Sequence, residues 1–209
     1  MQAAQQAAAD LKSRYRPLDN DHLDILFREA RSQNGWKDEP VSEATLRALY
    51  DLVKMGPTSM NCCPARFVFL SSDDSKARIK PFLMEGNVDK SMAAPVLAIV
   101  AHDLAFYEQM GKLLPIRDVR PMFENNAELA ASTAFRNGTL QGAYFMLAAR
   151  SLGLDCGPMS GFNNAEVDKE FFAGTQVRSN FICGLGHGDP GKVYPRLPRL
   201  GFEETCQTL

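Results

Sequence analysis

Apolar positions in this chain follow a helical spacing in several segments. Residues 3–11 favour a helix by composition, and residues 23–30 continue as a helix after a break at Pro17. Ser42 is a candidate N-cap for a helix that must end before the pair Gly56-Pro57. The helices expected further along the chain cover residues 74–83, 125–152 and 164–172.

Short apolar runs predict the strands. Residues 66–70 and 95–100 are rich in β-forming residues and predict central strands buried on both faces. Shorter strands are expected at 154–158 and 177–185. This pattern predicts an α+β fold, with a small mixed central sheet surrounded by helices. We expect one domain over residues 1–209, with an N-terminal helical arm at 1–20 and a C-terminal extension at 186–209.

The helix expected at 125–152 carries many small residues, which allow another backbone to approach closely. Either this helix is buried in its own core, or it packs against its two-fold mate in a dimer. The small residues are Ala130, Ala131, Ser132, Ala134, Gly138, Gly142 and Ala143.

Composition narrows the class of function. The formal net charge is -2 and no long run of Lys or Arg occurs, so nothing favours nucleic acid or an anionic membrane. No signal peptide and no apolar stretch long enough to span a bilayer is apparent. The five cysteines form no Cys-x-x-Cys pair, which indicates a reducing, cytoplasmic compartment. The three histidines are scattered, so no metal site is expected.

Two glycine-containing motifs are excluded by their context. The run at 184–188 does not predict a dinucleotide phosphate loop, because Asp189-Pro190-Gly191 follows where a helix must begin. Residues 157–161 are not a nucleophile elbow, because the serine comes one place too late. Cys62 and Cys63 are candidates for a reactive thiolate, although buried structural thiols are the favoured interpretation.

Three polar turns are not explained by the fold alone. They are Arg31-Ser32-Gln33-Asn34, the run from Gly56 to Asn61, and the run from Gly157 to Phe162. Each alone is ordinary turn chemistry. Together with Arg196 and Arg199 they offer arginines for a phosphate, polar side chains for hydroxyl groups, and loops whose backbone can approach a ring. That combination suits flavin mononucleotide (FMN).

These three segments, at 31–34, 57–64 and 152–162, resemble the landmarks of the FMN-dependent nitroreductase family in order and spacing. The resemblance covers roughly residue 23 to the C-terminus. It is strongest to the subfamily of NADH dehydrogenase/NAD(P)H nitroreductases that includes the malonic semialdehyde reductase of pyrimidine degradation. It implies a nitroreductase-like fold, a homodimer with a long interface helix, FMN as cofactor, and NADH or NADPH as hydride donor.

The resemblance implies which residues hold the phosphate end of FMN. Arg31, Ser32 and Asn34 would lie at the phosphate and ribityl end, and Arg196 or Arg199 would close on the phosphate. Many relatives have a second Arg or Lys where this chain has Asn34, which weakens the expected clamp.

It also implies contacts to the ring. Pro57, Thr58, Ser59 and Asn61 would reach across the dimer to the partner's flavin, and Asn137 would face the flavin. The backbone N–H of Ser160 would donate to N5, although many relatives have Glu there and have Gln-Pro-Trp where this chain has Cys63-Pro64-Ala65. The residues expected along the isoalloxazine are Pro158, Met159, Ser160 and Gly161.

The activity implied is ping-pong transfer of hydride from NAD(P)H to a small oxidised acceptor. The acceptor would be a nitro compound, a quinone or a semialdehyde such as malonic semialdehyde, the last being 3-hydroxypropionate dehydrogenase chemistry. No catalytic side chain is expected, because the flavin carries the reaction. Residues 113–126 either cap the slot, with Arg117, Arg120 and Phe123 selecting a carboxylated acceptor, or form a solvated surface loop. The alternatives are a flavin-binding sensor or carrier without turnover, and a cysteine-dependent enzyme using Cys62 or Cys63.

Overall fold

The computed structural model describes residues 1–209 and divides them into two units, Met1–Ala30 and Arg31–Leu209. In the first unit, the Asp19 carboxylate accepts a hydrogen bond from the His22 N–H at 2.9 Å and begins α2. The first unit ends at Ala30. Its elements are α1 (Gln2–Ser13), α2 (Asn20–Leu23) and the π-helical segment η1 (Asp24–Arg28).

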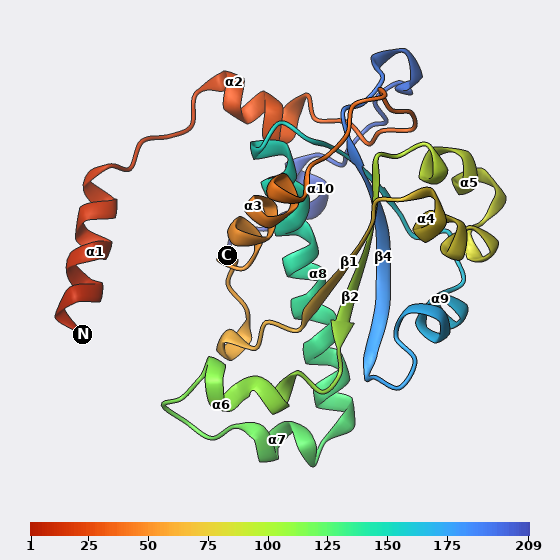
Figure 1. Cartoon of the computed structure of the whole chain (residues 1–209). Coiled ribbons are helices and arrows are strands. Elements are labelled where there is room, and N and C mark those ends of the chain that lie inside the picture. The colour runs from red at the N-terminus through yellow and green to blue at the C-terminus, as the bar shows by residue number, and fades with distance from the viewer. The chain divides into compact units, whose positions relative to one another are not determined.

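The second unit is built around one four-stranded sheet with the strand order β1-β2-β4-β3 (Figure 1). The expected α+β class is confirmed. The prediction of a mixed sheet is wrong for these four strands, because every neighbouring pair is antiparallel. Only an isolated bridge between Ser32 and Cys156 is parallel. The strands are β1 (Ala65–Leu70), β2 (Val96–Asp103), β3 (Asp155–Met159) and β4 (Val177–Gly186).

Of the two strands expected to be central, only β2 is. Seven of its eight residues are buried, whereas β1 lies at an edge of the sheet and is mostly half-buried. The apolar residues of β1 therefore do not mean that β1 is a central strand with a neighbour on each side. Its Phe67 and Phe69 pack instead on α8 (Ala127–Ser151), where both stack against Phe145.

The helices mostly begin and end where the sequence predicts. Ser42 is the N-cap of α3 and accepts from the Thr45 N–H at 3.1 Å, as expected. The helix expected at 74–83 ends at Ile79 and continues as a 3-10 turn that contains Pro81. Helix α5 was not predicted. The remaining elements are α3 (Glu43–Val53), η2 (Ser59–Asn61), α4 (Asp73–Ile79), η3 (Lys80–Phe82), α5 (Glu85–Met92), η4 (Phe106–Gln109), α6 (Met110–Leu113), α7 (Arg120–Glu124), α9 (Asn164–Phe171), η5 (Pro190–Lys192) and α10 (Phe202–Thr205).

Helices cover both faces of the sheet. Helices α3 and α8 lie on one face, and α4, α5 and α9 lie on the other (Figure 1). Strand β2 serves both cores, because successive side chains of a strand point to opposite faces. Val96, Ala98 and Val100 pack in the α3–α8 core, whereas Leu97 and Ile99 pack in the core that includes residues of α4 and α9.

The small residues of α8 are explained mainly by packing within the same chain. A Cβ on Gly138 would lie 2.7 Å from the His102 Cβ, and one on Gly142 would lie 2.7 Å from the Phe181 ring. These glycines let α8 approach its own sheet, which favours the first of the two explanations. The exposed face of α8 instead carries Phe135, Leu140 and Tyr144. No helix of the chain combines the length and apolar character needed to cross a membrane.

Candidate functional site

The Arg31–Asn34 segment runs along the free edge of β3. The Gln33 N–H donates to the Cys156 carbonyl oxygen at 3.0 Å, and Ser32 forms the parallel bridge with Cys156. The Cys156 carbonyl therefore points to the edge away from β4, and a Cβ on the next residue, Gly157, would lie 2.8 Å from the Gln33 carbonyl oxygen. The first and third predicted segments are therefore brought together.

The Asp155 carboxylate joins this edge to the C-terminal part of the chain. One oxygen accepts from the Gln33 Nε2 at 3.2 Å, and the other accepts from the Gly188 N–H at 2.8 Å. The Gln33 Oε1 is buried and has no hydrogen-bond partner. Neither side chain was predicted from sequence, because a lone Gln and a lone Asp in turns carry no distinctive spacing.

An open hollow of about 700 Å³ lies where these segments meet. It contains two cationic side chains, Arg31 and Lys37, and one carboxylate, Asp155, which is already hydrogen-bonded. The Arg31 guanidinium donates to the Tyr194 carbonyl oxygen, so the tail forms part of the wall. The hollow is lined by Arg31, Gln33, Lys37, Asp155, Gly188, Pro190, Val193, Tyr194 and Pro195.

The turn after β3 presents donors rather than acceptors. The Ser160 carbonyl accepts from the Phe162 N–H at 3.1 Å, and the Gly161 carbonyl accepts from the Met84 N–H at 3.0 Å. No hydrogen bond of the fold uses the N–H of Ser160 or of Gly161. Ser160 is exposed and Gly161 is half-buried. A ligand at this turn therefore meets N–H groups that have no acceptor.

Trp36, the one tryptophan of the chain, packs against the strands next to this turn. Its ring packs so closely on the strands that a Cβ on Gly184 would lie 2.5 Å from it and one on Gly157 would lie 3.1 Å from it. Its Nε1–H donates to the Lys90 carbonyl of α5 at 2.9 Å. In the 184–188 run that resembles a phosphate loop, Gly184 and Gly186 are thus packing positions against the indole, whereas Gly188 lies against the Gln33 side chain.

The second predicted segment, Pro57–Asn61, lies apart from the others within one chain. It precedes Ala65, which pairs with His102 at one end of β2, whereas Asp155 pairs with Gly186 at the Val96 end. The two regions therefore lie toward opposite ends of the sheet. One chain does not bring all of its predicted site residues together.

Asn137 holds this segment instead of facing an open site. Its Oδ1 accepts from the Ser59 N–H at 2.8 Å, its Nδ2 donates to the Thr133 carbonyl at 2.9 Å, and its side chain is fully buried. One helical turn later, the Gln141 Oε1 accepts from the Ala65 N–H at 2.9 Å. Its amide is buried and bonded within this chain, so the expected contact of Asn137 with a ring stays a prediction.

The Pro57–Asn61 segment is also conformationally unusual. Met60 and Asn61 have positive φ angles of 51° and 56°, and Cys63 follows with 39°. Side chains rarely adopt this region without support from the surrounding structure. The Thr58 hydroxyl accepts from the Cys63 N–H at 3.2 Å, and the Asn61 Nδ2 donates to the Leu113 carbonyl at 2.9 Å.

Residues 113–126 are only partly a loop, because they contain α7. Phe123 is 1% exposed and packs edge-on against Phe106, so it is a core residue and not a site residue. Arg120 pairs with Glu124 at 3.2 Å within α7. Arg117 is exposed and forms no side-chain hydrogen bond or ion pair. Of the three candidates, only Arg117 remains available to a ligand.

The C-terminal arginines are both exposed. The Arg199 guanidinium donates to the carbonyl oxygens of Leu197 and Pro198 at 3.0 and 3.1 Å, so these bonds stay within the tail. The Asn34 Nδ2 lies 3.5 Å from the Ser32 carbonyl, a weak contact inside its own turn.

Burial shifts the pKa of two groups near the Pro57–Asn61 segment. Burial raises the pKa of the Cys62 thiol to about 11, although a hydrogen bond with Thr58 opposes the shift. Burial likewise lowers the pKa of His102, with Arg178 adding to the effect against Asp168 and Asp103. Cys62 is therefore a neutral thiol at neutral pH, and His102 favours its neutral form.

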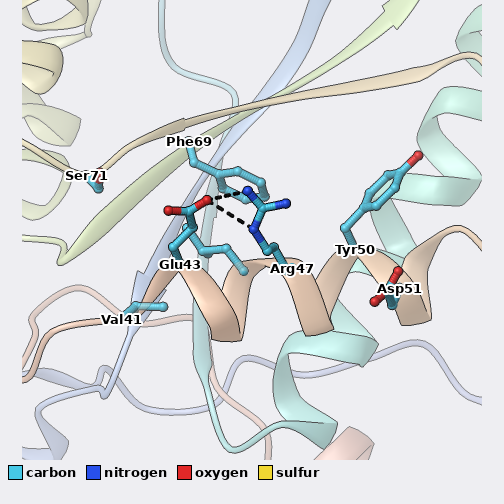
Figure 2. A pocket seen from close by; sticks show the side chains of 8 residues that line it. Val41, Glu43, Arg47, Tyr50, Asp51, Phe69 and Ser71 are labelled. Carbon is cyan, nitrogen blue, oxygen red and sulfur yellow. Dashed lines mark hydrogen bonds and ion pairs between the residues drawn. The ribbon is translucent and has the colours of Figure 1, made fainter.

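A second hollow, of about 560 Å³, lies between α3 and the outer edge of β1 (Figure 2). Its wall is partly apolar, with Val41, Leu46 and Phe69. Arg47 is paired with Glu43 at 2.5 Å, as the dashed lines in Figure 2 show. No predicted site residue lines this hollow, so it is separate from the candidate site.

The sequence model of the nitroreductase family matches residues 27–187 of this chain. The chain belongs to the nitroreductase family. That match includes the Arg31–Asn34 segment, the Pro57–Asn61 segment and the Ser160–Gly161 turn, which are the three segments that carry the geometry described above.

Relatives in this family share more than half of their residues with the chain. A protein of Cupriavidus pinatubonensis named "Putative NADH dehydrogenase/NAD(P)H nitroreductase" is 59% identical over 191 residues, which cover 90% of this chain and 97% of the relative. HadB of Ralstonia pickettii, which bears the same name, is 59% identical over 187 residues, covering 88% of this chain and 95% of HadB.

Solved structures of nitroreductases share the fold. A "putative nitroreductase" of Exiguobacterium sibiricum, solved in complex with FMN, has a TM-score of 0.81 at 20% identity and covers 93% of this chain and 100% of its own. A Staphylococcus epidermidis protein described as an NAD(P)H:FMN oxidoreductase has a TM-score of 0.79 at 17% identity, covering 93% and 99% of the two chains. At these identities the likeness concerns the fold.

Proposed function

We propose that this protein is an FMN-dependent oxidoreductase that transfers hydride from NADH or NADPH to a small oxidised acceptor. The observation that supports the proposal most directly is the arrangement of groups along one edge of β3. That edge joins the cationic hollow at Arg31 and Lys37 to the free N–H groups of the Ser160–Gly161 turn. The names of the relatives and the FMN complex of the structural neighbour support it.

The residues present fit FMN by their chemistry. A phosphate is dianionic, and charge-assisted bonds from an Arg or Lys stabilise it. A flavin ring is edged with acceptor atoms, which suits the unpaired N–H groups of the turn. The residues that would hold the cofactor are Arg31, Ser32, Asn34, Pro158, Met159, Ser160, Gly161 and one of Arg196 and Arg199, with Pro57, Thr58, Ser59 and Asn61 from the partner.

FMN, when bound, supplies the acceptance and donation of hydride, which no side chain offers. The protein would orient the reactants, because the edge of β3 and the close packing of Trp36 fix one wall of the site. We assign no acid–base side chain to the reaction. The charge of Arg31 stabilises an anion in the hollow, and the turn donates hydrogen bonds.

The proposed active form is a homodimer. The exposed face of α8 carries Phe135 at 54%, Leu140 at 47% and Tyr144 at 40% exposure. Leu140 and Tyr144, four residues apart, share one side of the helix, and exposed apolar pairs of this kind occur on surfaces that another protein covers. A second copy would also supply the Pro57–Asn61 segment that one chain holds away from its own β3 edge.

We propose a carboxylated acceptor, with malonic semialdehyde as the named candidate. Arg117 is a cation without a partner, and it lies in the loop that begins at Leu113, whose carbonyl is bonded to Asn61. The loop is thus joined to the segment proposed to enter the partner's site. In the overall reaction, NAD(P)H and a proton reduce the aldehyde to 3-hydroxypropionate and leave NAD(P)⁺.

The site also bears on two other functions. A cysteine-dependent enzyme is disfavoured at Cys62, because this thiol is fully buried and its pKa is raised to about 11. A flavin-binding sensor or carrier would use the same cofactor contacts and would differ only in turnover.

Purification and turnover test the proposal directly. The purified protein should be yellow, and acid should release FMN in near-equal amount to the chain. It should oxidise NADH or NADPH with a nitroaromatic compound or a quinone, and with malonic semialdehyde it should form 3-hydroxypropionate. A colourless protein that takes up no added FMN would overturn the proposal. Stable FMN binding without turnover would instead support the sensor or carrier.

A further inference from the structure

Helix α5 and the residues just before it are hydrogen-bonded to the turn after β3. The Met84 N–H, at its N-cap, donates to the Gly161 carbonyl at 3.0 Å, and the Asn163 N–H donates to the Phe82 carbonyl at 2.8 Å. Leu83 and Phe162 form an antiparallel bridge between these contacts. The turn is therefore held against α5 by backbone bonds on both sides of Phe162.

Two side chains one helical turn apart on α5 add further contacts to the same turn. The Asn87 Nδ2 donates to the Gly161 carbonyl at 2.9 Å, and the Ser91 hydroxyl lies 3.6 Å from the Met159 sulfur. Ser91 is fully buried and Asn87 is half-buried. Residues four apart on a helix share one face, so α5 presents this face to the turn.

The closeness of Asn87 explains why position 161 is a glycine. A Cβ at this position would lie 2.4 Å from the Asn87 Nδ2 and 3.2 Å from the Met84 sulfur. The φ of Gly161 is not positive, so backbone strain does not require the glycine. A larger residue here would instead displace the Asn87 amide from the Gly161 carbonyl.

The Gly161 carbonyl accepts two hydrogen bonds, from Asn87 and from the Met84 N–H, both on the α5 side. The Ser160 carbonyl is held within the turn by the Phe162 N–H. With both carbonyls held, neither can rotate toward a ligand. The turn is left presenting only the N–H groups of Ser160 and Gly161.

We propose that Asn87 is a positioning residue for the cofactor, which acts by holding the Gly161 carbonyl so that the turn offers donors to FMN. The inference rests on the proposed function and adds to it a residue outside the predicted segments. Asn87 itself contacts the turn and not the ligand. Its effect is therefore on cofactor affinity and on the environment of the ring.

Two substitutions separate the hydrogen bond from the volume of the side chain. Asn87→Asp keeps the shape but replaces a donor with an acceptor against a carbonyl oxygen, and Asn87→Ala removes the side chain. Asp89→Ala is the matched control, because Asp89 is exposed on the same helix and its side chain forms no hydrogen bond or ion pair. The dissociation constant of FMN is measured on apo-protein by quenching of FMN fluorescence.

We expect Asn87→Ala to weaken FMN binding by about threefold to tenfold, the range for loss of one net hydrogen bond. Asn87→Asp should weaken it by about tenfold or more, because two acceptors then face each other. Asp89→Ala should stay within about twofold. At saturating FMN, the absorbance spectrum of the Asn87→Asp protein should move toward that of free FMN, which a change in folding alone would not cause.

A double substitution tests the contact itself. Gly161→Ala should weaken FMN binding, and adding Asn87→Ala should recover part of the loss because the crowded amide is gone. Wild-type affinity and spectrum in Asn87→Asp, or strictly additive losses in the double variant, would overturn the inference. If wild-type protein binds no FMN, the proposed function fails instead. Thermal unfolding of each apo-protein identifies a variant that has merely lost its fold.

Discussion

Arg117 and Arg120 lie three residues apart in the same segment but differ in what they can bind. Arg120 pairs with Glu124 inside α7, whereas the Arg117 side chain has no partner. A cation already neutralised by a neighbour offers less to an incoming carboxylate. The sequence treats the two as equivalent, and the structure distinguishes them.

Replacing each arginine with alanine tests this difference. Arg117→Ala should raise the KM for malonic semialdehyde by about tenfold, since a charge-assisted bond contributes roughly 1.5–3 kcal/mol when it is formed. Arg120→Ala should change it by less than about threefold. Steady-state rates with a neutral quinone serve as the control for both. Equal effects on the quinone and the semialdehyde would contradict the role of Arg117.

His102 is predicted to make stability depend on pH. Burial lowers its pKa below the usual histidine value of 6.5, and its Nδ1 has no partner. The unfolded chain therefore binds a proton more readily than the folded chain. The stability that the neutral imidazole contributes is present above pH 6.5 and is lost as pH falls through the lower folded pKa.

Thermal unfolding between pH 7 and pH 5 measures this loss. The Tm of the wild type should fall over that range by a few degrees more than the Tm of His102→Leu, which cannot titrate there. His22→Leu is the control, because His22 is exposed in the first unit. Parallel Tm curves for wild type and His102→Leu would contradict the assignment.

Among the elements, α8 has a second role beyond packing. Its buried amides, Asn137 and Gln141, each accept a hydrogen bond from the segment that leads into β1. The two amides lie one helical turn from each other, so the helix holds both ends of the segment 59–65. This clamp supports the positive φ angles of Met60 and Asn61.

Removing one half of the clamp should loosen the segment without unfolding the sheet. Asn137→Ala leaves the Ser59 N–H without its acceptor, at an expected cost of about 1–3 kcal/mol if that group stays buried. We expect weaker FMN binding with the dimer intact, measured by fluorescence titration and gel filtration. Glu128→Ala, at an exposed position in the first turn of the same helix, is the control, because the Glu128 side chain forms no hydrogen bond or ion pair. Unchanged FMN affinity in Asn137→Ala would show that the segment does not act at the site.

Element α5 shows where pattern-based prediction reaches its limit. Its sequence contains Gly86, Asn87 and Asp89, all poor helix formers, so no helix was expected. Contacts with Trp36 and with the Gly161 turn stabilise it in the fold. In contrast, Ser42 predicts the start of α3 because capping is a local interaction.

For the whole molecule, the main prediction concerns assembly. Leu140→Glu places a charge beside Tyr144 on the exposed face of α8, and burying it unpaired in a dimer would cost several kcal/mol. The variant should be monomeric by gel filtration with light scattering and should bind FMN at least tenfold more weakly. Ala165→Glu, exposed on α9, is the control. A monomeric Leu140→Glu protein with full FMN affinity would place the whole site within one chain.

The sequence by itself determined the fold class, most helix and strand positions, and the segments resembling the family, because spacing, capping and turn chemistry are local. It did not determine the edge position of β1, the burial of Phe123 or the bonded state of Asn137. Those depend on contacts between residues far apart in the chain. Only the tertiary structure decided which candidate side chains stay available to a ligand, because pairing and burial are properties of neighbours in space.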